Sequence, residues 1–401
     1  MLKSRLCIAF FAFAVGCAPA QKPLTDYVNP MLGTATLWDS VDLGFKPTKR
    51  TWGAEVFPGS SLPNAMVQVS PVTKFHSGAG YQYEDSVIYG FTHTNKGHWN
   101  LCHIPLLPVT GTPTPGDYCS PFSHERESAA PGYYQVFLDR YGVDAQLSST
   151  LRCAFHKYTY PAGAAASLLA DLQRSNEHVR AWDIRKEGDN VFAGWQQTGE
   201  KMYFYAVANR PVTGIEPVVE GDREVRIVRF GEGDGALELR IGFSFVSEKN
   251  ARENLEAEML GKSFAEVRSE ATATWNDLLG RIRVEGGTER EKGLFYSSLY
   301  RSFLWPALRS DVNGEFTDVD GKVINPGFRY YTGPSYWDDY RNKLILLGML
   351  APDVAADVIS SDTDKGEKRG GFMPTFFHGD HASAFVAGTY LRGNRGFDVN
   401  R

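Results

Sequence analysis

The first half of the chain alternates apolar and polar residues over short runs. The clearest example is the segment GYYQVFLDRYGVDAQLSSTLRCAFHKYTYP (132–161), which is interrupted at Gly142 and ends at Pro161. Successive residues of a strand point to opposite faces, so this alternation predicts successive antiparallel strands. Segments 189–212 and 224–247 repeat the pattern. We therefore expect an antiparallel β-sandwich domain over residues 22–247.

The periodicity changes to that of helices near Ser247. Segment 250–282 is rich in Ala, Glu and Leu, lacks proline and predicts one or two helices, whose apolar face is Phe264, Val267, Ala271, Trp275 and Leu278. Further helices are predicted at 291–306, 335–352, 352–360 and 380–393, with long loops at 307–334 and 361–379. Asp380 is the expected N-cap and Gly393 the stop of the last helix. The chain is thus predicted to be an α+β multidomain protein.

The amino-terminal sequence has the pattern of an export signal. Lys3 and Arg5 precede an apolar run too short to span a bilayer as a mature helix, so residues 1–20 are predicted to be a signal peptide. Two endings stay open: cleavage after Ala20, or a lipoprotein signal with a lipid anchor at Cys17. Either ending predicts an exported protein, periplasmic or outer-membrane-anchored and extracellular in a bacterium.

Composition narrows the class of protein without identifying it. Hydrophobic residues make up 42% and charged residues 22% of the 401, as in ordinary globular proteins. A formal net charge of −5 argues against a general nucleic-acid-binding surface. Aromatic residues reach 13% and glycines 40, which fits both a β-rich fold and a protein that stacks sugar rings. Beyond the signal, Cys102, Cys119 and Cys153 allow at most one disulfide, and unpaired buried thiols are favoured.

The first candidate site is the segment 90–111, which carries His93, His98 and His103. Their five-residue spacing is not that of a helical zinc site, so a metal role is weakly supported. Trp99 and Asn100 beside His98 offer a stacking ring and an amide suited to sugar hydroxyls. The alternative is a β-hairpin that lines the core, with hydrogen-bonded histidines.

The second candidate site is the segment GPSYWDDYRNKL (333–344). On a helix, Trp337, Asp338 and Arg341 share one face, where the carboxylate and guanidinium suit adjacent hydroxyls of one sugar. The alternative is a surface ion pair, which would contribute little.

Two further segments concentrate polar groups. His378, Asp380 and His381 precede an apolar helix, where metal ligation, proton transfer, hydroxyl recognition and simple capping all stay open. Glu125 and Glu127 invite a glycosidase interpretation, but the nearby prolines favour a structural role.

Taken together, the chain resembles glycoside hydrolase family 92, the calcium-dependent exo-α-mannosidases of bacteria. The matching segments follow the family's order along almost the whole chain after the signal: DYVNPMLGT (26–34), VFPGSSLPNAMVQVSP (56–71), GYQYEDSVIYGFTHT (80–94), FSHERESAAPGYYQVFL (122–138), FYSSLYRSFLWP (295–306), YWDDYR (336–341) and GDHASAFVAGTYLRG (379–393). The sequence departs from the commoner family pattern in the segment TNKGHWN and at Asp339, which leaves the linkage specificity open.

The resemblance implies an N-terminal β-sandwich packed on an (α/α)6 barrel, with the active site between them. It implies removal of terminal α-mannose from glycans, such as N-glycans, with inversion of the anomeric carbon and calcium as cofactor. Residues 248–290 would be a helical linker and 291–401 the first part of the barrel. The implied substrate-binding residues are Gly33, Thr34, Pro58, Gly59, His98, Trp99, Trp337, Asp338 and Arg341.

The resemblance places the general acid, the general base and most calcium ligands beyond Arg401, so these 401 residues are expected to be inactive alone. Helix faces carrying Leu344, Leu346, Leu347, Phe385 and Val386 are expected to lie exposed without later partners. Two alternatives stay open. One is a non-catalytic mannoside-binding protein that uses Trp99 and Trp337, and the other is a zinc hydrolase that uses His93, His98 and His378.

Overall fold

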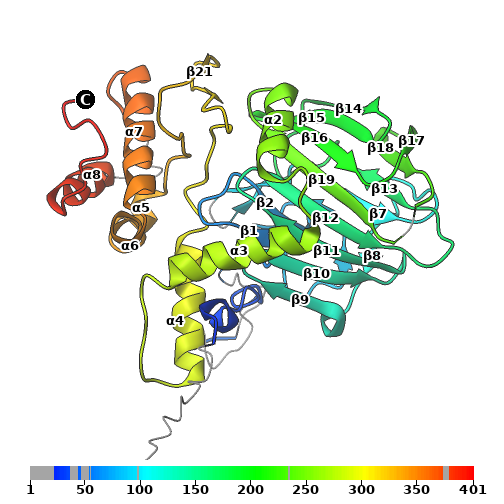
Figure 1. Cartoon of the computed structure of the whole chain (residues 1–401), viewed down its shortest axis with the longest axis horizontal. Helices are drawn as coiled ribbons and strands as arrows, with labels where there is room; N and C mark the ends of the chain where they lie inside the picture. Colours follow the sequence, from blue (N-terminus) through cyan, green and yellow to red (C-terminus); the bar gives the residue numbers. More distant parts are fainter. Residues whose placement is uncertain are drawn as a thin grey trace, which may run out of the picture.

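The computed structural model describes residues 22–36, 44–46, 54, 56–96, 99–233, 235–373 and 379–401. Its first part is a sandwich of a seven-stranded and an eight-stranded antiparallel sheet (Figure 1). Helices follow, which confirms the prediction of an α+β chain with an N-terminal antiparallel sandwich. Among the helices described, none is long and apolar enough to cross a membrane.

The two large sheets contain most of the strands. In spatial order the seven-stranded sheet holds β1 (Ser60–Ser61), β2 (Gln68–Val72), β4 (Gly90–Thr92), β7 (Leu106–Val109), β13 (Ser167–Ala170), β18 (Arg223–Phe230) and β17 (Val212–Glu220). The eight-stranded sheet holds β14 (Ala181–Gly188), β15 (Val191–Gln197), β16 (Lys201–Ala208), β19 (Leu237–Ser244), β12 (Cys153–Thr159), β11 (Val143–Ser149), β10 (Tyr133–Leu138) and β9 (Glu127–Ala130). Three small pairs complete the strands: β3 (Val87–Ile88) with β8 (Ser120–Pro121), β5 (Asn95–Lys96) with β6 (Trp99–Asn100), and β20 (Phe316–Thr317) with β21 (Val323–Ile324).

The sandwich forms because alternate strand residues are apolar and point between the sheets. In β16, Met202, Phe204, Ala206 and Ala208 are buried, while the residues between them are only partly buried. The apolar faces of both sheets belong to one continuous core that extends into the helices. Period-two alternation in the sequence therefore located the buried faces correctly.

The helical part holds seven α-helices among the residues described: α2 (Glu248–Glu258), α3 (Phe264–Leu279), α4 (Glu289–Ser302), α5 (Tyr336–Asp339), α6 (Lys343–Leu350), α7 (Pro352–Lys368) and α8 (His381–Leu391). Short 3-10 turns, η1 (Leu24–Tyr27) and η2 (His124–Arg126), lie in the first part. The face predicted for 250–282 is buried as expected. Asp380 caps α8, where its carboxylate accepts the Ser383 N–H at 3.2 Å.

The predicted bounds of one helix and of one loop were wrong. The predicted helix 335–352 is two helices, because the Asn342 side chain accepts the Lys343 N–H at 2.6 Å and caps a new start. The predicted loop 361–379 begins too early, since α7 continues to Lys368. The polar residues of this part of α7 wrongly indicated a loop, because they are buried and paired: Asp362, for example, bonds to Lys365 within α7 and to Tyr336 of α5.

The prediction that the apolar helix faces would lie exposed was also wrong. Leu344, Leu347 and Phe385 are buried, and Leu346 and Val386 are partly buried against the same core. These side chains find partners within the described chain because α6 packs against both α7 and α8. Figure 1 shows α5 to α8 gathered on the side of the molecule away from the sheets.

Hydrogen bonds join the segment after α4 to the sandwich. Gln68 Nε2 donates to the Leu304 carbonyl at 2.6 Å, and Asn64 Nδ2 donates to the Pro306 carbonyl at 2.8 Å. Further along, Asp311 accepts from the side chains of Ser244 at 2.7 Å, Asn250 at 2.9 Å and Asn254 at 2.7 Å. These bonds fix one wall of the cleft described next.

Helices α3 and α4 are anchored at the end of the sandwich. Trp275 of α3 is fully buried, and its Nε1–H donates to the Ser61 carbonyl of β1 at 2.7 Å. Its ring lies 4.4 Å from the Tyr300 ring of α4. η1 lies against the same two helices (Figure 1), where the Thr25 N–H donates to Asn276 Oδ1 at 3.1 Å.

Candidate active-site cleft

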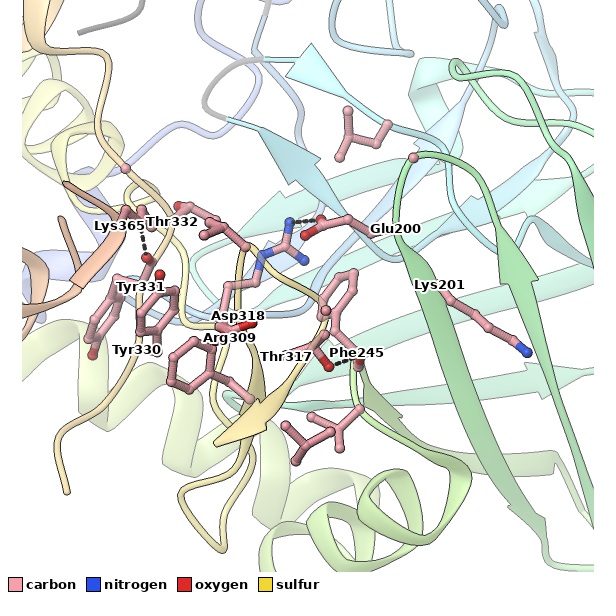
Figure 2. Close-up of a pocket in the computed structure, with 18 of the residues that line it drawn as sticks. Glu200, Lys201, Phe245, Arg309, Thr317, Asp318, Tyr330, Tyr331, Thr332 and Lys365 are labelled. Carbon is pink, nitrogen blue, oxygen red and sulfur yellow. Dashed lines mark hydrogen bonds and ion pairs between the residues drawn. The ribbon is translucent and has the colours of Figure 1, made fainter. Parts of the chain in front are cut away.

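A cleft of about 840 Å³ lies between the sandwich and the segment that leads into the later helices (Figure 2). The sandwich side contributes Leu101, Glu177, the β15–β16 turn at 199–201, Tyr203, Phe245 and Val246. The opposite side contributes Trp305, Arg309, the β20–β21 hairpin, residues 330–334, Lys365 and Arg369. Aromatic faces mixed with carboxylates and cations form a lining suited to a polyhydroxylated ligand.

One ion pair joins the two walls of the cleft. Arg309 Nη2 lies 2.7 Å from Glu200 Oε2, and the guanidinium lies 3.8 Å from the centre of the Phe245 ring (Figure 2). Thr317 Oγ1 also donates to the Phe245 carbonyl at 3.2 Å. The β15–β16 turn and the hairpin segment are therefore held at a fixed separation.

Asp318 fixes the turn of the β20–β21 hairpin. Its Oδ1 accepts the N–H groups of Asp320 at 2.9 Å and Lys322 at 2.8 Å, and Lys368 Nζ lies 2.9 Å from its Oδ2. Burial by itself raises the pKa of Asp318, but the bonds from Lys368 and the two backbone N–H groups outweigh it and lower the pKa. This carboxylate is therefore ionised at neutral pH, and its bonds give it a structural role.

Lys365 is a largely buried cation in the lining of the cleft. Its Nζ donates to the Tyr331 carbonyl at 2.9 Å and to Asp362 Oδ1 at 2.8 Å. Asp362 Oδ2 accepts the Tyr336 hydroxyl at 2.6 Å, which ties α7 to α5. Tyr330 stacks on Phe316 with ring centres 3.6 Å apart, and its buried hydroxyl has no hydrogen-bond partner among the described residues.

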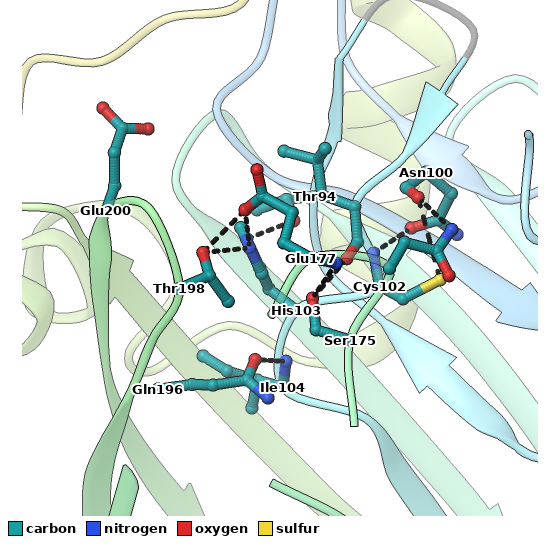
Figure 3. Close-up of polar contacts among 12 residues, drawn as sticks. Thr94, Asn100, Cys102, His103, Ile104, Ser175, Glu177, Gln196, Thr198 and Glu200 are labelled. Atoms are coloured by element: carbon teal, nitrogen blue, oxygen red, sulfur yellow. Dashed lines mark hydrogen bonds and ion pairs between the residues drawn. The ribbon is translucent and has the colours of Figure 1, made fainter. Parts of the chain in front are cut away.

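A carboxylate on the sandwich wall is held from beneath by a buried histidine (Figure 3). Glu177 Oε2 lies 3.1 Å from His103 Nε2 and accepts the Thr198 hydroxyl at 2.6 Å. His103 is 3% exposed, and its Nδ1 lies 2.9 Å from the Thr94 hydroxyl. Of His93 and His103, the two described histidines in segment 90–111, His103 is thus the one placed next to the cleft.

The sandwich residues predicted to bind sugar occupy tight turns. Thr34 is buried, and its hydroxyl donates to the Met31 carbonyl at 2.8 Å, while Gly33 has a positive φ of 89°. Pro58 is buried, and a Cβ on Gly59 would lie 1.9 Å from the Val69 carbonyl oxygen. These contacts give Gly33 and Gly59 structural reasons to be glycine, and their binding roles stay predictions.

The other predicted sandwich residues are less fully described. Trp99 lies in β6, which pairs with β5, and His98 lies outside the described residues. His93 is fully buried, with its Nε2 3.1 Å from His156 Nε2 of the facing sheet. Burial lowers the pKa of His93 to about 3, so the ring is neutral in the core.

Trp337, Asp338 and Arg341 are all exposed, and the hydrogen bonds of Asp338 and Arg341 go to their own neighbours in the chain. Asp338 accepts the Ser335 hydroxyl at 2.5 Å, and Arg341 Nε donates to the Tyr340 hydroxyl at 2.9 Å. The fold instead brings α5 against the start of α8. The His381 ring lies 5.6 Å from that of Trp337 and stacks on Tyr340 at 4.1 Å.

The described residues do not provide a complete metal site. No group of three or more His, Cys, Asp or Glu side chains converges within this part of the chain. His378, needed for the zinc alternative, lies outside the described residues. Cys102, Cys119 and Cys153 are free. Glu127 accepts the hydroxyls of Tyr81 at 3.0 Å and Tyr134 at 2.5 Å, a structural use of this glutamate.

Sequence reasoning missed the polar residues that line the cleft: Glu177, Glu200, Arg309, Asp318 and Lys365. Each stands alone in its segment without a recognisable motif, and their partners lie on other elements. The sequence pointed to this region only through neighbouring segments: the long loop at 307–334, segment 90–111 with Leu101, and segment 333–344 with Gly333 and Pro334.

Comparison with known proteins identifies the family. The model of the "Glycosyl hydrolase family 92 N-terminal domain" matches residues 27–253, and that of the "Glycosyl hydrolase family 92 catalytic domain" matches residues 250–401.

Solved structures agree with these matches. The GH92 alpha-mannosidase BT3965 from Bacteroides thetaiotaomicron is 26% identical with a TM-score of 0.84, over 94% of this chain and 55% of that one. The same enzyme in complex with mannoimidazole has a TM-score of 0.83. An "Uncharacterized secreted glycosidase" from Arthroderma benhamiae is 24% identical over 344 residues, 72% of this chain and 42% of that protein. The chain therefore spans about half the length of these relatives.

Proposed function

The chain belongs to glycosyl hydrolase family 92, a family of glycosidases, and we propose that the protein to which it belongs is an exported, inverting α-mannosidase acting on terminal mannose of glycans. Support comes from the similar protein BT3965, an alpha-mannosidase whose structure is also known in complex with mannoimidazole. The secreted relative and the predicted signal peptide at 1–20 support export.

The single observation that carries the proposal is the cleft between the sandwich and the helical part. Its lining combines carboxylates (Glu177, Glu200), a guanidinium (Arg309) and aromatic rings (Trp305, Tyr330) on two walls joined by an ion pair. Planar acceptors and donors beside apolar ring faces match the alternating hydroxyls and C–H faces of a sugar. The neighbouring segments carry the predicted sugar-binding residues: Leu101 follows Trp99, and Pro334 precedes Trp337.

In this proposal, Trp337, Asp338 and Arg341 bind the terminal mannose from the helical side. Gly33, Thr34, Pro58, Gly59, His98 and Trp99 form the sandwich side of the same site. Inversion requires a general acid and a general base on opposite faces of the sugar. We assign neither role within these 401 residues and propose calcium as the cofactor of the whole protein.

The test is mannose release from a panel of α-linked mannobioses by the whole protein with calcium present. Proton NMR of the first product distinguishes inversion, which gives β-mannose, from retention. Release of β-mannose supports the proposal. Binding of mannobiose in calorimetry without any turnover would instead favour a non-catalytic glycan-binding protein.

A further inference from the structure

Glu177 sits where a ligand in the cleft would meet it. Its side chain is 41% exposed, and it lines the cleft together with Leu101 and Glu200; Figure 3 shows Glu177 and Glu200. Arg309 and the largely buried Trp305 line the opposite wall, where the guanidinium carries hydrogen-bond donors. A carboxylate and a guanidinium that line one cleft can both form hydrogen bonds with the hydroxyls of a sugar.

The carboxylate of Glu177 is held in one orientation. A carboxylate only accepts hydrogen bonds, so His103 Nε2, which faces Oε2 at 3.1 Å, is the donor of this bond. On the other side of the ring, Nδ1 lies 2.9 Å from the Thr94 hydroxyl, and the Thr198 hydroxyl donates to the same Oε2 at 2.6 Å. His103 and Thr198 are both nearly or fully buried, so this support stays in place as a ligand enters.

The backbone that carries Glu177 is held as well. The Glu177 N–H donates to Ser175 Oγ at 3.1 Å, and that hydroxyl donates to the Leu101 carbonyl at 2.7 Å. Asn176 Nδ2 donates to the Asn100 carbonyl at 2.6 Å. The loop that carries Glu177 is thereby fixed to the segment after Trp99, which lies at the predicted sugar site.

The cleft lies beside the residues proposed to bind the terminal mannose, without including them. Among the described residues that line it, none is Trp337, Asp338 or Arg341, although Gly333 and Pro334 of the same segment do line it. A sugar at Glu177 would therefore be the next residue of the glycan, the one that leaves after cleavage.

We propose that Glu177 contacts hydroxyls of this leaving-group sugar and contributes to selection among glycan substrates, with His103 and Thr198 as its positioning residues. The inference rests on the proposed mannosidase function. An aryl leaving group has no sugar hydroxyls to contact, so the effect must depend on the substrate.

The experiment compares kcat/KM of the whole protein for an α-linked mannobiose and for 4-nitrophenyl α-mannoside. For Glu177→Gln we expect the ratio of mannobiose to aryl mannoside efficiency to fall about tenfold, since one hydrogen bond to a charged group is lost. Thr198→Val should lower the same ratio about threefold by freeing the carboxylate. Glu125→Gln, an exposed glutamate at the start of η2, is the control and should leave the ratio unchanged.

The outcomes separate the two proposals. If the wild-type protein hydrolyses neither substrate, the proposed function fails. If it hydrolyses both and Glu177→Gln changes them equally or not at all, the role of Glu177 in binding the leaving-group sugar is wrong. If Glu177→Gln fails to fold, Thr198→Val decides, because a structural role alone would lower the melting temperature without changing the ratio.

Discussion

The guanidinium of Arg309 lies 2.7 Å from the carboxylate of Glu200, which links the β15–β16 turn to the segment before the β20–β21 hairpin. The Glu200 side chain is 62% exposed, so water and salt screen the pair. Arg152 and Glu258 form a contrasting pair at 2.6 Å, with side chains only 8% and 12% exposed. The two pairs have similar geometry but different burial.

Glu200→Gln should therefore lower the free energy of unfolding by less than about 1 kcal/mol. Glu258→Gln should lower it by roughly 3 kcal/mol, because Arg152 and the Thr150 hydroxyl lose a buried charged acceptor. Urea unfolding at neutral pH measures both values. Equal effects of the two substitutions would contradict the dependence on burial.

Trp275 anchors α3 to the sandwich, so its truncation should be costly. We expect Trp275→Ala to lower the free energy of unfolding by about 3–5 kcal/mol, and Trp275→Phe by about 1–3 kcal/mol through loss of the bond to Ser61. Trp337→Phe is the matched control, because Trp337 is 42% exposed and should change stability by less than about 0.5 kcal/mol. A similar loss for both Phe variants would show that α3 is not anchored through this indole.

His93 and His156 should stay neutral well below the pH at which a free histidine titrates. Burial lowers the pKa of His93 to about 3 and that of His156 well below its ordinary value. As the pH falls, the histidines of the unfolded state bind protons near pH 6.5, well before the buried rings of the folded state do. The contribution of the two neutral rings to stability is therefore present above about pH 6.5 and is lost as the pH falls below it. Histidine ¹⁵N NMR between pH 8 and 4.5 should show neither ring titrating. A midpoint near 6.5 for either ring would refute the assignment.

Asp311 should respond to pH in the opposite direction. Burial raises its pKa to about 6 despite the bonds from Ser244, Asn254 and Asn250. Between about pH 4 and 6 the Asp311 carboxyl is therefore protonated in the folded state and ionised in the unfolded state. Its contribution to the free energy of unfolding increases as the pH falls through 6.

We expect Asp311→Ala to lower the free energy of unfolding by about 2–4 kcal/mol at pH 7, since three donors lose their acceptor, and by more at pH 5. Exposed Asp320→Ala is the control. A penalty that shrinks at pH 5 would mean that the pKa of Asp311 is not raised.

Local patterns were enough to predict the sandwich and most helices. Period-two alternation marked the strands, and helical spacing marked the buried face of Phe264, Val267 and Trp275 in α3. Both patterns depend on neighbours a few residues apart, which the sequence displays directly. The break at Asn342 and the length of α7 were missed, because a capping side chain and long-range polar partners decided them.

The sequence by itself thus determined the order of sandwich and helices, the family resemblance and the segments near the site. Tertiary structure decided which polar residues meet in the cleft. Glu177 and His103 are 74 residues apart, and Glu200 and Arg309 are 109 apart, yet each pair lies within 3.1 Å. Such pairs arise because two packed layers bring distant turns to one edge, and no local spacing records which turns will meet.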